Sequence, residues 1–461
     1  MSQVQLEKAQ ENKMGVMPVN KLLVNMSLPM MASMLVQALY NIVDSIFVAR
    51  VSENALTAVS LAFPIQTLMI ALGTGTGVGV NALLAKQLGE KDYKRVNKTA
   101  MNGMLLAFLS FLVFFIFGFV GVRPFYASQV TVADAEILTM GVEYLSIVCI
   151  GSIGSYTQLM SEKLLQATGK TIYSMFSQGL GAIINIILDP ILIFGLCGMP
   201  KMGIAGAALA TIIGQIAGGA LALYFNLTKN HEIKFLLENL KPDAQIIKKI
   251  YKVGLPSIIM QSIGSVMTYS MNLILIGFTS TATAVFGVYF KLQSFFFMPV
   301  LGLNNGLVPI IAYNYGAGKR SRMLKTTKLS YVYAFILMSL GFLAFELIPE
   351  VLLGLFKASP EMIEIGVPAL RIIGIHFLIA WYCIITGSVF QALGNGLYSM
   401  IVSVARQLVV LIPVAFVLAK ISGLQAVWWA FPSAELMSLT VSTLFLIKIN
   451  KDVIKNIPDN V

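Results

Sequence analysis

The sequence predicts an all-α polytopic membrane protein, and three observations carry that prediction. Of its 461 residues, 57% are hydrophobic and only 11% are charged, whereas a soluble domain is usually about a quarter charged. The mean hydropathy is +0.81. Runs such as 103–122 are apolar on every face, which favours spanning helices over an outer-membrane barrel. Together these features exclude a cytosolic enzyme, a disordered scaffold and a nucleic-acid-binding protein.

The hydrophobic runs predict twelve spanning helices, since each span needs about 20 apolar residues. We expect them near 22–48, 56–83, 98–121, 137–159, 171–196, 203–225, 251–277, 283–311, 327–348, 366–389, 397–419 and 424–447. The first hydrophobic run is too long for a cleavable signal peptide, so the first span is expected to act as an uncleaved signal.

Basic residues fall mainly on one side of these spans. With the N-terminus inside, 24 of the 32 Lys and Arg residues lie in the two terminal segments and in the loops on the same side, and 5 lie on the opposite side. Such a bias marks the cytoplasmic face, so both termini are expected in the cytoplasm. The formal charge of +11 therefore reflects topology and not a nucleic-acid partner.

The two halves of the chain repeat one pattern. Residues 85–99 align with 312–326 at an offset of 227, and Leu28-Pro29 aligns with Leu255-Pro256 at the same offset. Residues 166–175 align with 391–400 at an offset of 225. Six spans separate the copies, so both halves have the same orientation in the membrane, which is typical of alternating-access transporters.

The repeat predicts five parts of the chain: a cytoplasmic N-terminal segment at 1–21, a first lobe at 22–225, a linker at 226–250, a second lobe at 251–447 and a cytoplasmic tail at 448–461. The linker is basic. The pattern of residues 231–240 predicts an amphipathic helix that lies along the membrane surface.

Several other signals indicate packing and not chemistry. Cys149, Cys197 and Cys383 lack the spacing of a disulfide framework or a zinc site and are interpreted as small buried hydrophobic residues. Residues 169–171 resemble the end of a phosphate-binding loop but lack its first glycine. The glycine run 73–79 lies inside an apolar span, where close helix packing or a hinge explains it better than a dinucleotide site.

The first span carries an acidic residue, Asp44, after Gln37, Tyr40 and Asn41. This spacing places the four polar residues on one stripe of an otherwise apolar helix. An ionisable side chain inside a membrane is costly and marks a candidate functional site.

The fifth span carries a second acidic residue. Asn185 and Asp189 are four residues apart and share a helix face. Pro190 cannot donate a hydrogen bond to the carbonyl of residue 186, so we expect a kink and a free carbonyl beside the Asp189 carboxylate.

These carboxylates, with amide, hydroxyl and carbonyl oxygens, would suit Na⁺ or, in a drier site, would carry protons. The alternative is a structural polar contact between helices, or a position near the membrane interface. The repeat supplies a comparison, because Asp44, Asn185 and Asp189 correspond to Met271, Val410 and Val414 in the second half. The acids are therefore not part of the repeated scaffold, and a coupling-cation site in the first half explains them best.

Further polar residues are weaker candidates. The seventh span carries a polar face that would line a substrate pathway, made of Gln261, Ser265, Thr268 and Asn272. In-span charged or titratable residues would either face a cavity, pair within a lobe or extend to the membrane surface; they are Lys291, His376, Arg406 and Glu435.

Taken in order, six motifs give the chain a specific resemblance over about residues 20–448: Ser27–Met30, Ala85–Gly89, Gln166–Gly169, Asn185–Phe194, Gly203–Thr211 and Pro309–Gly316. The chain resembles the MATE (multidrug and toxic compound extrusion) transporters of the bacterial DinF/MepA-like branch. The resemblance implies two six-helix lobes around a central cleft, in a bacterial cytoplasmic membrane. It also implies export of diverse, often cationic and aromatic compounds in exchange for H⁺ or Na⁺.

The resemblance also assigns roles to single residues. It implies a cation site in the first lobe, where Asp44, Asn185 and Asp189 are joined by Thr211 as the hydroxyl of the sixth helix. Pro29 matches a proline at which the first helix bends. The NorM-type relatives carry an acid in the seventh helix, but 256–277 contains none, which argues against a site of that kind in the second lobe.

We therefore expect a secondary multidrug antiporter that acts on small molecules within the bilayer, as a monomer, without a cofactor and without a nucleic-acid partner. One alternative is a flippase for lipids or lipid-linked oligosaccharides, which would need several basic residues in its cleft. A second alternative is a membrane-embedded enzyme acting on lipids, which would need clustered acids for Mg²⁺, such as DDxxD, and the sequence has none.

Overall fold

The computed structural model describes residues 11–129 and 135–459. The first half contains the short helix α2 (Lys13–Val16) and the long helices α3 (Val19–Ala49), α4 (Glu53–Gly89), α5 (Tyr93–Val120), α7 (Ala135–Ile150), α8 (Ile153–Ala167), α9 (Thr171–Phe194) and α10 (Ile204–Thr228), with α6 (Val122–Ala127) between α5 and α7. The second half contains α11 (Ala244–Ile276), α12 (Ser280–Gly316), α13 (Arg320–Leu347), α14 (Pro349–Gly354), α15 (Pro360–Gly374), α16 (Phe377–Ala392), α17 (Gly396–Val404), α18 (Ile412–Ser422), α19 (Leu424–Val427) and α20 (Ala430–Asp452).

Ten of the described helices are long and apolar enough to cross a membrane, and two bent pairs raise this to twelve if each pair is one span. This agrees with the twelve predicted spans. The sequence predicts unbroken helices at 137–159 and 366–389, but the chain bends by 44° between α7 and α8 and by 49° between α15 and α16. At the first bend, a Cβ on Gly151 would lie 2.2 Å from Cδ1 of Ile212 of α10, so α10 can pack against this bend because residue 151 is a glycine.

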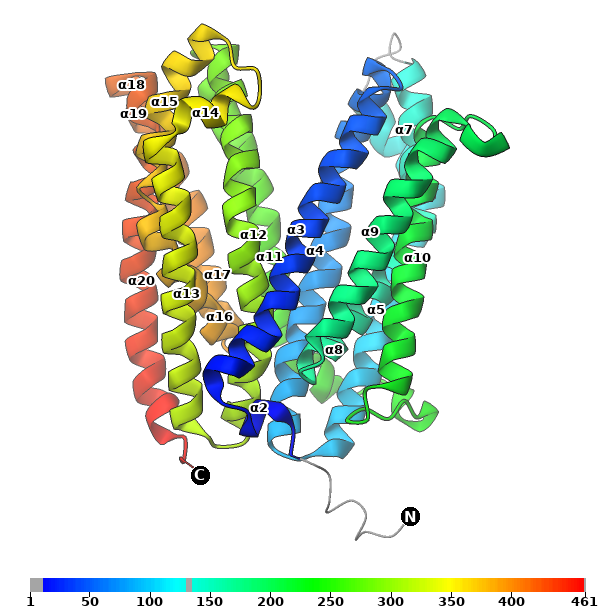
Figure 1. Ribbon diagram of the computed structural model, residues 1–461, viewed down its shortest axis with the longest axis vertical. Coiled ribbons are helices and arrows are strands. Elements are labelled where there is room, and N and C mark those ends of the chain that lie inside the picture. Colours follow the sequence, from blue (N-terminus) through cyan, green and yellow to red (C-terminus); the bar gives the residue numbers. More distant parts are fainter. Residues whose placement is uncertain (1–10, 130–134, 460–461) are drawn as a thin grey trace.

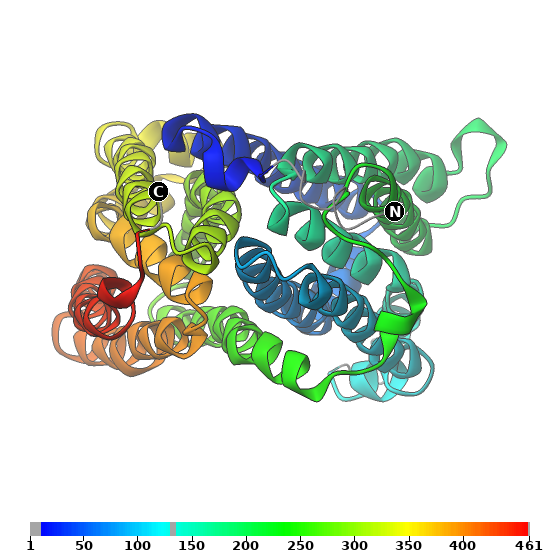
Figure 2. The same ribbon diagram turned by 90° about the horizontal axis from the view of Figure 1, so that it is seen from below.

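The helices stand side by side in two groups that lie close together at one end and diverge toward the other (Figure 1). Seen from below, the groups meet along four helices, where α3 packs on α12 and α4 packs on α11 (Figure 2). Both described ends of the chain lie at the close end. There Lys319 bonds to Glu11, and the Ser321 amide donates to Asp459 at 2.8 Å.

The contact between the two groups obeys the internal repeat. A Cβ on Gly75 of α4 would lie 2.8 Å from the backbone nitrogen of Ile258 of α11, and a Cβ on Gly302 of α12 would lie 2.5 Å from Cα of Met31 of α3. The two glycines are 227 residues apart, and so are their partners. The interface is therefore one glycine-on-backbone contact made twice.

The same rule holds nearer the end of the molecule. Gly79 approaches the backbone of Gly254, and Gly306 approaches that of Ser27, with the offset of 227 preserved in both pairs. Of the two explanations for the glycine run 73–79, packing or a hinge, close helix packing is the one seen at Gly75 and Gly79.

At the tip of this interface two repeat-related glycines pack against the opposite chain segments. A Cβ on Gly89 would lie 2.0 Å from the carbonyl oxygen of Tyr313, and a Cβ on Gly316 would lie 2.0 Å from that of Lys86. Because Tyr313 and Lys86 are also 227 residues apart, the pseudo-two-fold axis passes between α4 and α12 at this point. A side chain on either glycine would separate the two halves.

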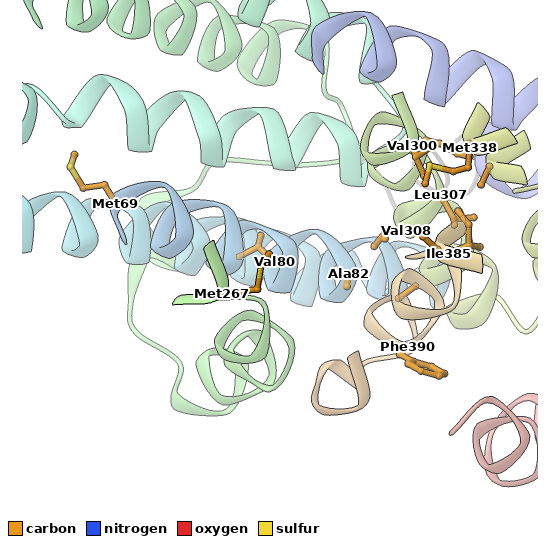
Figure 3. Close-up of a cluster of buried hydrophobic side chains, with 14 of the residues drawn as sticks. Met69, Val80, Ala82, Met267, Val300, Leu307, Val308, Met338, Ile385 and Phe390 are labelled. Atoms are coloured by element: carbon orange, nitrogen blue, oxygen red, sulfur yellow. The ribbon is translucent and has the colours of Figure 1, made fainter. Parts of the chain in front are cut away.

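The apolar core continues across this contact. Figure 3 shows buried side chains of α4, such as Val80 and Ala82, near Leu307 and Val308 of α12 and Ile385 of α16. All five are at most 7% exposed. The close end of the molecule is therefore sealed by packed apolar side chains as well as by glycine contacts.

Residues 11–17, including α2, join the two halves on this sealed end. On the first half, Asn12 donates to the carbonyl of Thr168 at 3.0 Å. On the second half, the carbonyl of Met14 accepts from Asn314 at 3.1 Å and from Arg322 at 3.1 Å. The segment therefore fastens the loop after α8 to α12 and α13.

The linker between the halves is not the amphipathic helix predicted for 231–240. It contains one 3-10 turn, Leu237–Leu240, and its Lys234 amide donates to Asn97 Oδ1 of α5 at 2.7 Å. Asp243 then caps the start of α11. Bonds to side chains of this kind compete with the bonds that a helix needs, so the linker lies along the end of α5 instead.

The cysteines depart from the prediction at one position. Cys149 and Cys383 are buried, as expected, but Cys197 is exposed. It lies in the short turn Leu196–Gly198 after α9, with a left-handed φ of 55°. The turn projects beyond the helices, so the apolar sequence around Cys197 does not bury it.

Substitution of Gly79 tests the glycine contact. Gly79→Ala should lower the thermal unfolding temperature of the purified protein, because its Cβ would lie 2.2 Å from the Ile250 carbonyl oxygen and overpacking costs about 1–3 kcal/mol. Gly287→Ala is the matched control, since no atom lies within 4 Å of its Cβ, and it should gain up to about 1 kcal/mol from helix propensity. Equal shifts for the two variants would refute the contact.

Substitution of Lys319 tests the N-terminal fastening. Its ammonium donates to Glu11 Oε1 at 2.8 Å and to the Gly15 carbonyl. The hydrogen bond to Glu11 holds the pKa of that carboxyl below its usual range. A lowered pKa means that the pair stabilises the fold above the unfolded value of 4.5 and loses its contribution as the pH falls through the folded value. Lys319→Gln should therefore speed tryptic cleavage after Lys13 several-fold at neutral pH.

The matched control for that experiment is Lys325→Gln, which replaces an exposed lysine of α13, the helix that Lys319 precedes. It should leave cleavage after Lys13 unchanged. If trypsin cleaves both Lys319→Gln and Lys325→Gln after Lys13 at the wild-type rate, the N-terminal segment is not held by Lys319.

Candidate functional site

The predicted cation site lies between three helices of the first half. Asn185 and Asp189 stand one turn apart on α9, and Thr211 faces them from α10. With its amide oriented so that both ends are satisfied, Asn185 donates to Asp189 Oδ2 at 3.3 Å and accepts from the Thr211 hydroxyl at 3.2 Å and the Thr211 amide at 3.1 Å. Gly214 lets α10 approach α9 here, because its Cβ would lie 3.3 Å from Cβ of Asn185.

Asp44 of α3 completes this group. The helix α3 packs on α9, and the charges of Asp44 and Asp189 repel each other. In each residue Oδ1 is buried and has no hydrogen-bond partner in the described part of the chain, and Asp189 itself is 0% exposed. Two close carboxylates with unused buried oxygens need a cation or a proton to offset their repulsion. Oxygen atoms of Asn185 and Thr211 would serve a hard cation as further ligands.

The predicted polar stripe on α3 is only partly brought to this site. Tyr40 lies near both acids, since it interacts electrostatically with Asp44 and Asp189. Gln37 accepts a hydrogen bond from Gln178 of α9 at 3.2 Å. Asn41 is exposed, and among the described residues its side chain has no hydrogen bond to this group.

The two prolines lie inside their helices. Pro29 is within α3, between Ser27 and Met31, which touch the glycines of α12. Pro190 is within α9, which continues to Phe194 as one helix. The helix therefore does not end at Pro190, and the expected kink and free carbonyl beside Asp189 stay a prediction.

A second feature, a cavity of about 770 Å³, opens on the second half. Its walls come from α11, α12, α20, the widened turn Ala405–Leu411 and His376 between α15 and α16, and Phe63 and Pro64 of α4 reach it from the first half. The four residues predicted to line a substrate pathway are all on its wall: Gln261, Ser265, Thr268 and Asn272. Sequence periodicity alone placed them on one face of the seventh span.

Three of the four charged or titratable candidates also line this cavity. Arg406 Nη1 donates to Glu435 Oε2 at 3.3 Å, so the two residues pair within the second half and also face the cavity. His376 is buried with its ring against Phe297. Lys291 is not on the cavity wall, and its ammonium lies 5.9 Å from the centre of the Phe356 ring.

Two buried charges escaped the sequence analysis because the fourth span was expected to end at 159. The helix α8 continues and buries Glu162 and Lys163, which are 5% and 9% exposed. Glu162 accepts from Ser177 at 3.1 Å, and Lys163 donates to Asn305 of α12 at 2.9 Å, a bond across the two halves. The signal was the polar i, i+4 series of residues 158, 162 and 166, which continues the helix beyond its apolar run.

Comparisons with known proteins agree with this architecture. The family model described as MatE matches residues 29–191 and 256–417, once in each half, and the two matches begin 227 residues apart. The multidrug export protein MepA of Staphylococcus haemolyticus is 30% identical over 418 residues, which cover 90% of each chain. MepA of Staphylococcus aureus strain MSSA476 is 26% identical over 93% of this chain and 94% of its own.

Solved structures give the same fold. A multidrug resistance MATE transporter in an outward-facing conformation superposes with a TM-score of 0.90 at 24% identity, covering 97% of this chain and 99% of that one. A crystal structure of MATE in complex with MaL6 also gives 0.90 at 24% identity, covering 97% and 100%. The resemblance drawn from the six sequence motifs is thus confirmed, and the chain belongs to the MatE family.

Proposed function

We propose that the chain is a secondary multidrug exporter, which expels small compounds from a bacterial cell in exchange for an inward-moving H⁺ or Na⁺. The relatives that cover most of the chain are named multidrug export proteins. The observation that carries the coupling is the pair Asp44 and Asp189, whose buried Oδ1 atoms are unpartnered among the described residues. The acids lie in one half, and the large cavity opens mainly on the other.

The first helix connects the cation site to the interface between the halves. Asp44 lies 15 residues after Pro29 in α3, which is about 22 Å along a helix. Pro29 stands between the two residues that touch α12. A cation that draws α3 toward Asp189 would therefore change its bend at Pro29 and loosen its contact with Gly302 and Gly306.

The orientation follows from the charge bias. We place the sealed end, with both termini, in the cytoplasm, so the divergent end faces outward from the cytoplasmic membrane. One chain carries both copies of the repeat, so we propose that a monomer suffices. With the divergent end facing outward, the described conformation is one that has opened to release its compound outside the cell.

The lining of the cavity favours this function over a flippase for lipid-linked oligosaccharides. Among the described residues on its wall, Arg406 is the one Lys or Arg side chain, and it is paired with Glu435. A pyrophosphate headgroup carries several negative charges and needs a cluster of basic donors. A membrane-embedded enzyme would instead need acids clustered for Mg²⁺, whereas Asp44 and Asp189 form a single pair.

The substitution Asp189→Asn tests the cation site. It should abolish resistance to toxic compounds in an efflux-deficient host while the protein still reaches the membrane, because an amide can neither take up a proton nor neutralise Na⁺. Resistance and membrane content are measured on the same cells.

Val414→Asn places the same side chain at the repeat-equivalent position of the second half. It should cause a much milder loss of resistance, since no acidic pair lies there. Normal resistance with Asp189→Asn, or an equal loss with Val414→Asn, would contradict a site confined to the first half.

Proteoliposomes identify the coupling ion. Purified protein should export a fluorescent compound under an imposed H⁺ gradient or an imposed Na⁺ gradient, applied separately, and Asp189→Asn should abolish the response. Transport that needs neither gradient would contradict coupling to these ions.

A further inference from the structure

The charge that a ligand meets in the cavity is positive. Arg406 and Glu435 both line the wall, but the Arg406 side chain is 28% exposed and that of Glu435 only 3%. The carboxylate is therefore much less accessible to a compound in the cavity than the guanidinium whose charge it offsets.

The guanidinium has donors to spare. Its one hydrogen bond to a described residue joins Nη1 to Glu435 Oε2 at 3.3 Å, whereas an arginine fork presents several N–H groups in one plane. Such a fork binds a carboxylate through two parallel hydrogen bonds. The other oxygen of Glu435, Oε1, is buried and has no partner in the described residues, so Glu435 holds Arg406 by a single contact.

Aromatic side chains surround this position. The Tyr289 ring packs edge-on against Phe290 and Phe431, with centroids 5.5 Å and 5.6 Å apart, and Phe297 packs on His376. All of these residues line the cavity. Tyr289 and Phe431 are 0% and 6% exposed, so they support the half-buried rings of Phe290 and Phe297, which give a planar compound fixed surfaces on which to stack.

The backbone and the repeat both single out Arg406. It lies in the π-helical turn Ala405–Leu411, a distortion that is frequent at functional sites, and Pro413 follows two residues later. At the offset of 225 that relates the eleventh span to the fifth, Arg406 corresponds to Gly181. The guanidinium is therefore an addition to the repeated scaffold, as the two acids are in the first half.

We propose that the cavity selects aromatic compounds that carry a carboxylate, whether as acids or as zwitterions, with the carboxylate on Arg406 and the rings against Phe290 and Phe297. This inference rests on the proposed exporter function and specifies its substrate class. A compound whose only charge is positive gains nothing from Arg406.

A matched pair of probes tests the proposal by equilibrium binding. Pyrenebutyrate and its methyl ester share one ring system and differ in the carboxylate, and both are followed by fluorescence on the purified full-length protein. The acid should bind about tenfold more tightly than the ester, as expected for a charge-assisted hydrogen bond. Arg406→Gln should remove this difference by weakening the acid alone.

Further variants separate recognition from folding. Arg371→Gln replaces an exposed arginine of α15 outside the cavity and should preserve the tenfold preference. Arg406→Lys keeps the positive charge but not the planar fork of N–H donors, so it should retain part of the preference for the acid. Glu435→Gln, measured on protein that still unfolds cooperatively, should strengthen binding of the acid because it frees the guanidinium.

Three results would overturn the proposal: equal binding of acid and ester by the wild type, equal weakening of both probes by Arg406→Gln, or loss of the preference in Arg371→Gln. The exporter function is tested apart from this by transport of a cationic dye in proteoliposomes. Dye transport without a preference for the acid would refute the substrate class alone. A preference for the acid without any transport would refute the exporter and leave a binding site.

Discussion

The close approach of two helix pairs, α4 on α11 and α12 on α3, is the constraint on which the rest of the structure depends. Glycines at 75, 79, 302 and 306 let backbone meet backbone, and each contact has a copy at an offset of 227. In a bilayer, where burial of apolar surface does not drive helices together, such close packing supplies much of their association. Because the contact occupies only one end, the two halves diverge beyond it, and the cavity lies in that divergent part.

On this symmetric scaffold each half carries its own polar group. The first half has Asp44 and Asp189 beside Asn185 and Thr211. In the second half, the residues equivalent to Asp44, Asn185 and Asp189 are all hydrophobic. The second half has Arg406 and Glu435 on the cavity wall. Symmetry gives two equivalent halves, and we propose that asymmetry assigns different tasks to them: cation coupling in one and compound recognition in the other.

Much of this was predictable because membrane helices obey simple rules. Apolar length placed the twelve spans, and the offset of 227 placed the interface glycines in equivalent positions. The bends at Gly151 and before Phe377 were not predictable, since they depend on which helix packs opposite. The linker was misjudged because Asn97 lies more than a hundred residues from Lys234, and the pattern of 231–240 holds no sign of that bond.

The candidate sites divide in the same way. Helical spacing brought Asn185 to Asp189 and placed Gln261, Ser265, Thr268 and Asn272 on one face, because such relations are local. The pairing of Arg406 with Glu435 joins two spans and was left open, as was the exposure of one partner and the burial of the other. Glu162 and Lys163 were missed because apolarity stops at residue 159 although the helix does not.

The central claim is that cation binding at Asp189 moves one half against the other. A spin label on the exposed Cys197 and one on Leu355→Cys, which is exposed at the divergent end of the second half, report the separation of the halves by pulsed electron spin resonance. The account predicts that adding H⁺ or Na⁺ shifts this distance distribution in the wild-type background and not in Asp189→Asn. An equal shift in both proteins, or none in either, would contradict it.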